Sequence, residues 1–297
     1  MRFDVYTPLL LSLLLPLVSP VIGRRVAPAL AARVLASAAV LTAAATTWSL
    51  ALLGAALLGD APPVVREARE EGHRLADPVP GVIGVVACLA LAVAVWRVQR
   101  ALRAERRTRR ALHRVCAGHP ADTELIVAAS EVPQAFAIPG RPGRILVTSA
   151  MLGALTPAER RVLLAHERAH LTHRHGPLVS AVTLAAAANP LLAPVRSAVT
   201  FLVERWADEQ AAAAVGDRGT TARALARAAL TAGRARRACA LSFTDRAVTR
   251  RIAALQTTPP PHLWSAALAV LALGALPALL AVDATGDLLA LLGSALT

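Results

Sequence analysis

The segment His166-Glu167-Arg168-Ala169-His170 carries three side chains whose types and spacing suit metal-dependent hydrolysis. The two histidines are four residues apart, so on a helix they lie on one face and can bind one Zn²⁺ through their imidazole rings. Glu167 lies beside them and can reach a water molecule on the metal. Zinc lowers the pKa of that water, and the carboxylate can accept its proton. The motif predicts that His166 and His170 are zinc ligands and that Glu167 is the general base.

This motif requires a helix, and the preceding residues predict one. Thr156, Pro157 and Glu159 are typical of an N-cap, a first-turn proline and an early acidic residue. We expect the helix to run to about His175 and to stop at Gly176-Pro177. The alternative is a solvated helix face rich in His and Arg, and the capped helix favours the catalytic interpretation.

A catalytic zinc ion takes a third protein ligand, and a later helix offers two acidic residues one turn apart. Glu204 is the expected ligand, and Asp208 is expected to accept the ring N–H of a ligating histidine. The alternative is an ordinary acidic pair beside Arg205. His173 is expected to have a structural or solvent-exposed role, because it lies beyond the histidine pair.

These residues belong to a longer run, from Gln134 to Asp208, that resembles two groups of membrane gluzincins. One group is the BlaR/MecR-like peptidases, and the other is the HtpX and CAAX-prenyl-protease-like peptidases. The close resemblance covers roughly a quarter of the chain. It is carried by Gln134-Ala135-Phe136-Ala137, Ile145-Leu146-Val147-Thr148, Leu155-Thr156-Pro157-Ala158-Glu159, His166–His170 and Glu204-x-x-Ala-Asp208.

The resemblance implies roles for further residues. The segment Gln134, Ala135, Phe136 and Ala137 would form an edge strand that pairs with extended substrate, although these families often have Asn where this chain has Gln134. His175 would have a structural role. Arg251, in Arg251-Ile252-Ala253-Ala254-Leu255, resembles an arginine near the active site that acts on the transition state or on the structure. Arg250 is adjacent, and a basic helix flank that faces lipid head groups is the alternative for both.

Hydrophobic residues make up 56% of the chain, which exceeds the share in ordinary soluble proteins. They gather in long apolar runs, of which the later three are long enough to cross a bilayer as helices. The first run is short and rich in proline. These runs are residues 7–22, 34–58, 79–96 and 263–282.

Charged residues beside the apolar runs give the orientation. Arginines without acidic residues follow the first run, an excess of acidic residues lies in Asp60–Pro78, and a cluster of arginines follows the third run. Because arginine-rich flanks stay in the cytoplasm, we expect the catalytic domain to be cytoplasmic, with the N- and C-termini outside.

The sequence therefore predicts a mainly α, multi-pass protein of the cell membrane, with about four transmembrane helices and an α+β gluzincin-like zinc peptidase domain. Residues 1–98 would form an N-terminal membrane region with about three spans. Residues 99–261 would form the peptidase domain, and residues 262–297 a C-terminal span and tail.

The function expected from this organisation is that of a metalloendopeptidase with one Zn²⁺ per chain. Its substrate would be a cytoplasmic repressor, as the resemblance implies, or a membrane protein. The alternative is a catalytically weak regulator that keeps the fold and signals through partners. No nucleic-acid partner is expected despite the net charge of +13, because the arginines flank apolar runs and lack interleaved aromatic residues.

Overall fold

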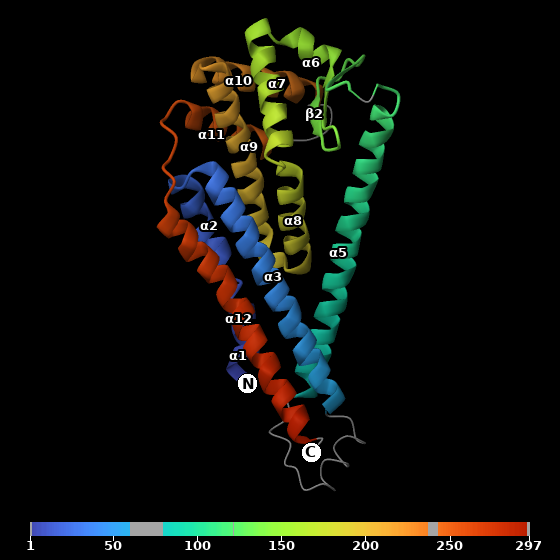
Figure 1. Ribbon diagram of the computed structural model, residues 1–297, viewed down its shortest axis with the longest axis vertical. Coiled ribbons are helices and arrows are strands. Elements are labelled where there is room, and N and C mark those ends of the chain that lie inside the picture. Colours follow the sequence, from blue (N-terminus) through green and yellow to red (C-terminus); the bar gives the residue numbers. More distant parts are fainter. Residues whose placement is uncertain (1, 60–79, 121, 237–242, 296–297) are drawn as a thin grey trace.

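The computed structural model of the chain describes residues 2–59, 80–120, 122–236 and 243–295 (Figure 1). The predicted loop Asp60–Pro78 lies outside the described residues. Long helices form the lower part of the molecule in Figure 1, and shorter helices with a small sheet form the upper part.

Four stretches of helix are long and apolar enough to cross a membrane: Tyr6–Arg25, Pro28–Ala55, Gly81–Cys116 and Trp264–Val282. This confirms the prediction of about four spans by length and composition. The stretches belong to helices α1 (Arg2–Leu11), α2 (Leu14–Arg25), α3 (Pro28–Gly59), α5 (Gly81–Cys116) and α12 (Trp264–Ala295). The third predicted span and the arginine-rich segment after it are one continuous helix, α5.

The break between α1 and α2 follows from proline chemistry. Pro16 has no backbone N–H, and its ring crowds the carbonyl group four residues earlier, at Ser12. The helix is interrupted at Ser12 and Leu13. The hydroxyl group of Ser12 donates a hydrogen bond to the Leu9 carbonyl at 2.7 Å. The first span is therefore two short helices in sequence.

Helices α3 and α12 pack backbone to backbone. A Cβ atom added at Gly274 would lie 2.6 Å from the Cα atom of Ala38. Small residues at such crossings let helices in a membrane approach closely. The main buried core joins these two helices to α2, α8 (His175–Ala188) and α9 (Ala193–Val215).

The polar part of the chain contains a three-stranded sheet and six helices among the described residues. Its strands are β1 (Leu125–Ala128), β2 (Ala135–Ile138) and β3 (Arg144–Thr148), in the order β1-β3-β2. β1 is parallel to β3, and β2 is antiparallel to it, so β2 is an edge strand as predicted. Besides α8 and α9, the helices are α6 (Ser149–Ala154), α7 (Pro157–Thr172), α10 (Arg218–Arg236) and α11 (Phe243–Leu255), and the 3-10 turn η1 is Pro190–Leu192.

The end of α7 differs from the sequence prediction. Gly176 and Pro177 do not end α7, which stops at Thr172; they lie in the first turn of α8, where a proline without a backbone donor is well tolerated. The two helices are separated at Arg174, whose φ of 52° places it in the left-handed region, and α8 continues below α7 in roughly the same direction (Figure 1). Helix α8 then packs against α3, α5 and α9, so this apolar segment is part of the core.

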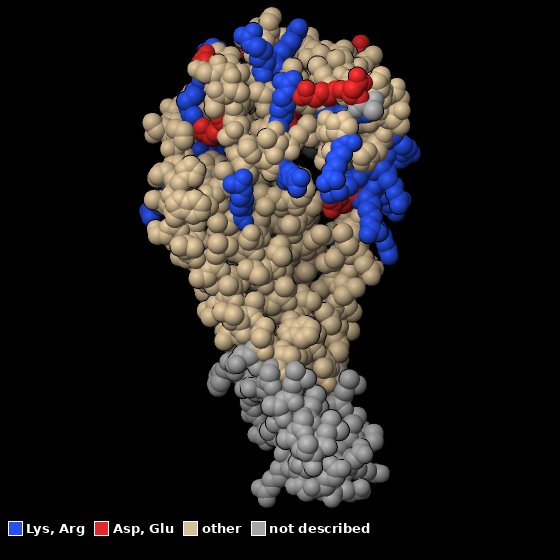
Figure 2. Space-filling model, in the orientation of Figure 1, with Lys and Arg blue, Asp and Glu red and all other residues tan. Residues whose placement is uncertain are grey.

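Charged side chains gather at one end of the molecule. On the face drawn in Figure 2, the blue and red residues are scattered among uncharged ones over the upper part, where the sheet and the short helices lie. Below them, the described surface on this face consists of uncharged residues. This distribution is the one expected of a membrane protein with a polar domain at one end of its spans.

Candidate active site

Helix α7 is fixed at its N-terminus by a complete capping box. The Thr156 backbone N–H donates to the Glu159 carboxylate at 2.9 Å, and the Glu159 N–H donates to the Thr156 hydroxyl group at 3.4 Å. Glu159 also pairs with Arg227 of α10 at 3.1 Å. The start of α7 is thereby held against a second helix, and this sets the position of the two histidines further along it.

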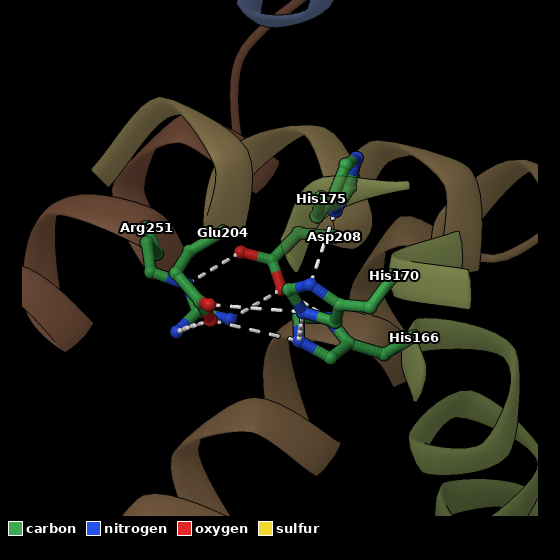
Figure 3. Close-up of polar contacts among 6 residues, drawn as sticks. All are labelled: His166, His170, His175, Glu204, Asp208 and Arg251. Carbon is green, nitrogen blue, oxygen red and sulfur yellow. Dashed lines mark hydrogen bonds and ion pairs between the residues drawn. The ribbon is translucent and has the colours of Figure 1, made fainter. Parts of the chain in front are cut away.

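Three donor atoms from α7 and α9 meet at one point (Figure 3). The Nε2 atoms of His166 and His170 are 3.1 Å apart, and each is 3.6 Å from a carboxylate oxygen of Glu204. A zinc ion binds imidazole nitrogen at about 2.0–2.1 Å, so neighbouring ligands in a tetrahedral site lie about 3.4 Å apart. Together these residues form a group that could hold a metal ion. Both the donor types and their separations fit zinc.

Both histidine rings are also oriented by contacts at Nδ1, the ring nitrogen that faces away from Glu204. His166 Nδ1 lies 3.1 Å from Asp208 Oδ1, so this carboxylate is placed to accept the ring N–H. His170 Nδ1 lies 3.0 Å from His175 Nδ1. Such contacts hold a metal-binding ring in the tautomer that leaves Nε2 free to bind.

The contact between His170 and His175 fixes a second tautomer. If His170 donates from Nδ1, then Nδ1 of His175 must accept, and the proton of His175 is on Nε2. Burial lowers the pKa of His175 to about 3, which keeps this ring neutral and able to accept. Within the described part of the chain, the buried His175 Nε2 has no hydrogen-bond partner; the ring packs on Trp206, 4.4 Å away between centroids.

Arg251 ties the two acidic residues of α9 together. Its Nε and Nη2 atoms donate to the two carboxylate oxygens of Asp208, each at 2.7 Å, and its Nη1 lies 3.0 Å from Glu204. The neighbouring Arg250 instead lies over the ring of Phe201, 4.2 Å from its centroid. Of the two arginines, Arg251 is the one that reaches the site, and its contacts favour the structural role.

Glu167 is buried beside the two histidines and faces the sheet. Its carboxylate accepts a hydrogen bond from the backbone N–H of Ala137 in β2. Burial raises the pKa of this carboxyl group, which makes it a better proton acceptor when ionised. Of the segment predicted as a substrate edge strand, Ala135, Phe136 and Ala137 lie in β2, and Gln134 immediately precedes it.

The charge of the cluster also suits a cation. Burial disfavours the protonated form of His166, but hydrogen bonds to Asp208 and Glu204 outweigh it and raise the pKa to about 10. Burial and the positive charge of His166 lower the pKa of His170 to about 4. Burial opposes ionisation of Glu204, yet the hydrogen bond from His166 lowers its pKa to about 2. One positive charge is thus favoured between these three groups, and a metal ion would replace that proton.

Two features of the site have no signal in the sequence. His175 reaches His170 across the helix break at Arg174, and residue spacing does not reveal this break. His173, outside the donor group as predicted, stacks on Trp206 at 4.7 Å between centroids. The aromatic packing around Trp206 joins segments that are far apart in the sequence, including Arg33 of α3 at 4.3 Å.

Comparisons with known proteins give one match. Residues 99–189 match the sequence model of Peptidase family M48, a family of metallopeptidases. The matched region includes the sheet, α7 with both histidines and Glu167, and α8, but it ends before α9 and α11. No curated protein and no solved structure matches the chain. The placement of Glu204, Asp208 and Arg251 in the site therefore rests on geometry.

Proposed function

We propose that the chain is a zinc-dependent metalloendopeptidase of a membrane, on the premise that residues 99–189 match the sequence model of Peptidase family M48. The observation that carries this proposal is the donor group of His166, His170 and Glu204 with Glu167 buried at its side. Two imidazoles and one carboxylate are a ligand set of catalytic zinc sites, which keep one position open.

The chain's own residues would perform the proton transfers. Zinc, when bound, would polarise the scissile carbonyl group and lower the pKa of a water molecule. Glu167 would accept a proton from the attacking water and then donate it to the leaving amine nitrogen. Asp208 and His175 would hold the two histidine rings in place. Arg251 would keep Asp208 ionised, since its guanidinium group lowers the pKa of that carboxyl group against the effect of burial.

The substrate is proposed to bind along β2. An edge strand offers unpaired backbone groups to which an extended peptide can add as a further strand. Because the N–H of Ala137 bonds the Glu167 carboxylate, a peptide alongside β2 would pass next to the general base. Any extended segment could bind in this way, which suits an endopeptidase. A cytoplasmic repressor or a membrane protein remains the proposed substrate.

The peptidase domain is proposed to face the cytoplasm. The end of α2, which carries Arg24 and Arg25, and the arginine-rich end of α5 lie at the same end of the spans as the sheet (Figure 1), and arginine-rich flanks stay inside. Maleimide labelling of a cysteine placed at the exposed Arg106, with the native cysteines removed, tests this in inverted and right-side-out vesicles. Labelling from outside intact cells would contradict it.

The test of the enzymatic proposal is cleavage of unfolded casein by the purified full chain. We expect activity that disappears with a chelator, returns with Zn²⁺, and is absent from Glu167→Gln, which keeps the metal ligands. A Glu167→Gln protein that still cleaves casein would rule out the mechanism. A wild-type protein that binds zinc but cleaves nothing would support the regulatory alternative.

A further inference from the structure

A second cluster of charged residues lies on the other side of α9 and α11 from the metal ligands. It lines a pocket of about 350 Å³ between the end of α2, these two helices and the segment that leads to α12. Arginines from three elements line this pocket: Arg24 of α2, Arg205 of α9 and Arg250 of α11. Among the described residues, no acidic side chain lines it. The arrangement favours an anionic ligand.

The deepest of the three arginines forms no ion pair among the described residues. Arg205 is 9% exposed, and its buried Nε has no hydrogen-bond partner among the described residues. The two nearest carboxylates are engaged elsewhere: Asp208 by Arg251, and Glu209 by Arg218 at 3.1 Å. Burying an unpaired guanidinium donor is costly, and an anion in the pocket would remove that cost.

The other two arginines form the exposed side of the pocket. Arg24 is held by a 3.2 Å hydrogen bond from its Nε to the Pro20 carbonyl group, and Arg250 by its contact with Phe201. Within the described ranges, neither forms an ion pair. Both side chains are therefore oriented but not neutralised, and their remaining N–H groups can bind an anion.

The position of the pocket indicates where the anion comes from. Arg24 is next to the last residue of the candidate span Tyr6–Arg25, at the level where lipid head groups lie. Leu17 and Val21 precede it by seven and three residues, so all three share one face of α2. Leu17 and Val21 are exposed, at 71% and 46%. An acyl chain could lie on these two residues while its head group reaches the arginines.

We propose that this pocket binds the phosphate group of an anionic phospholipid of the adjacent leaflet. Guanidinium groups match phosphate oxygens in charge and in hydrogen-bond geometry. Inorganic phosphate shares this chemistry but would leave the apolar face of α2 unused.

The bound phosphate would also join the two helices that hold the active site. Arg205 directly follows Glu204, and Arg250 directly precedes Arg251. On one side Arg251 links α11 to α9 through Glu204 and Asp208; on the other, the phosphate would link the same helices through Arg205 and Arg250. Anionic lipid would therefore hold Arg251 on its partners and raise peptidase activity, a consequence that rests on the proposed function.

Binding is measured by native mass spectrometry of the full chain in detergent, titrated separately with phosphatidylglycerol, phosphatidylcholine and inorganic phosphate. The background variant is Glu167→Gln, so that the result does not depend on catalysis. We expect one phosphatidylglycerol per chain, bound at least about tenfold more tightly than phosphatidylcholine. A protein that binds both lipids equally, or that takes phosphate and no phosphatidylglycerol, would overturn the proposal.

Matched variants locate the site. Arg24→Gln with Arg250→Gln changes two exposed side chains of the pocket and should weaken phosphatidylglycerol binding at least about tenfold. Arg25→Gln with Arg246→Gln removes the same charge from neighbouring exposed positions and should leave binding unchanged. Equal binding by the two double variants would show that the lipid is held elsewhere.

Activity in nanodiscs separates the two proposals. We expect casein cleavage to rise several-fold when phosphatidylglycerol replaces phosphatidylcholine, and this rise should be absent from the Arg24→Gln/Arg250→Gln protein. Specific lipid binding without cleavage in any lipid would refute the enzymatic function and leave the lipid site standing. A cleavage rate that stays the same when phosphatidylglycerol is bound would refute the coupling between lipid binding and peptidase activity.

Discussion

Replacing Asp208 with Asn tests how much the residues that contact the metal ligands contribute to zinc affinity and to stability. Asp208 accepts two hydrogen bonds from Arg251 at 2.7 Å and lies 3.1 Å from the ring nitrogen of His166. An amide of the same shape has only one acceptor oxygen, and its NH₂ group would meet donors. Oδ1 faces both His166 Nδ1 and Arg251 Nη2, and Oδ2 accepts from Arg251 Nε. We therefore expect Arg251 to lose one of its two contacts with this residue, and the His166 ring to lose its fixed orientation wherever the NH₂ group takes the place of Oδ1.

The magnitude follows from these contacts. Loss of the group that orients a metal-binding histidine typically weakens metal binding about 10–100-fold, or about 1.4–2.7 kcal/mol. Breaking a buried ion pair by removing one partner costs about 3–5 kcal/mol. Arg251 still has Glu204 at 3.0 Å, so we expect a smaller loss of stability, about 1–3 kcal/mol.

The assay is competition for zinc against a chromophoric chelator, with thermal unfolding in detergent measured in parallel. Glu209→Gln is the control, because Glu209 is the next residue on α9 but bonds Arg218 instead of the site. A folded Asp208→Asn protein that binds zinc as tightly as wild type would refute the orienting role. So would an equal loss of zinc affinity in Glu209→Gln.

Three further changes test separate parts of the structure. His175→Phe removes the acceptor for the ring N–H of His170 and should weaken zinc binding about 10–100-fold, measured by the same competition. Zinc uptake at pH 7 should release about one proton, because the raised pKa keeps His166 protonated in the metal-free protein. For the same reason, zinc affinity should increase with pH until the pH reaches about 10. Calorimetry in buffers of different ionisation enthalpy measures the proton release. Gly274→Leu should lower the unfolding temperature, because even a Cβ atom would lie 2.6 Å from Ala38; overpacking of this kind costs about 1–3 kcal/mol.

Controls make these outcomes decisive. His175→Asn keeps an acceptor and should restore part of the zinc affinity that His175→Phe loses. Gly233→Leu adds the same side chain to α10, where a Cβ atom meets nothing within 4 Å, and should leave the unfolding temperature nearly unchanged. Zinc binding without proton release at pH 7 would show that His166 is neutral in the metal-free protein.

The sequence reveals those features that depend on one element. His166, Glu167 and His170 follow from helical spacing, and the start of α7 follows from Thr156 and Glu159. The spans follow from their apolar length. The position of β2 at the edge of the sheet was also predicted, from the resemblance.

Features that depend on how elements meet could not be predicted in the same way. His175 was expected at the end of α7, but it begins α8, and its ring meets His170 across the helix break at Arg174. The choice between Arg250 and Arg251 needed the packing of α11 on α9. The arginine pocket combines residues from three elements, and none of them has a distinctive spacing.

The most direct test of the central claim is the zinc content of the purified full chain, measured beside Glu204→Ala. Glu204 lies outside the region that matches the peptidase family, so that match does not support its role as a ligand. We predict about one zinc per chain in wild type and in Glu209→Ala, and loss of that zinc from Glu204→Ala. A Glu204→Ala protein that retains its zinc, or a wild type that takes up none, would contradict the account.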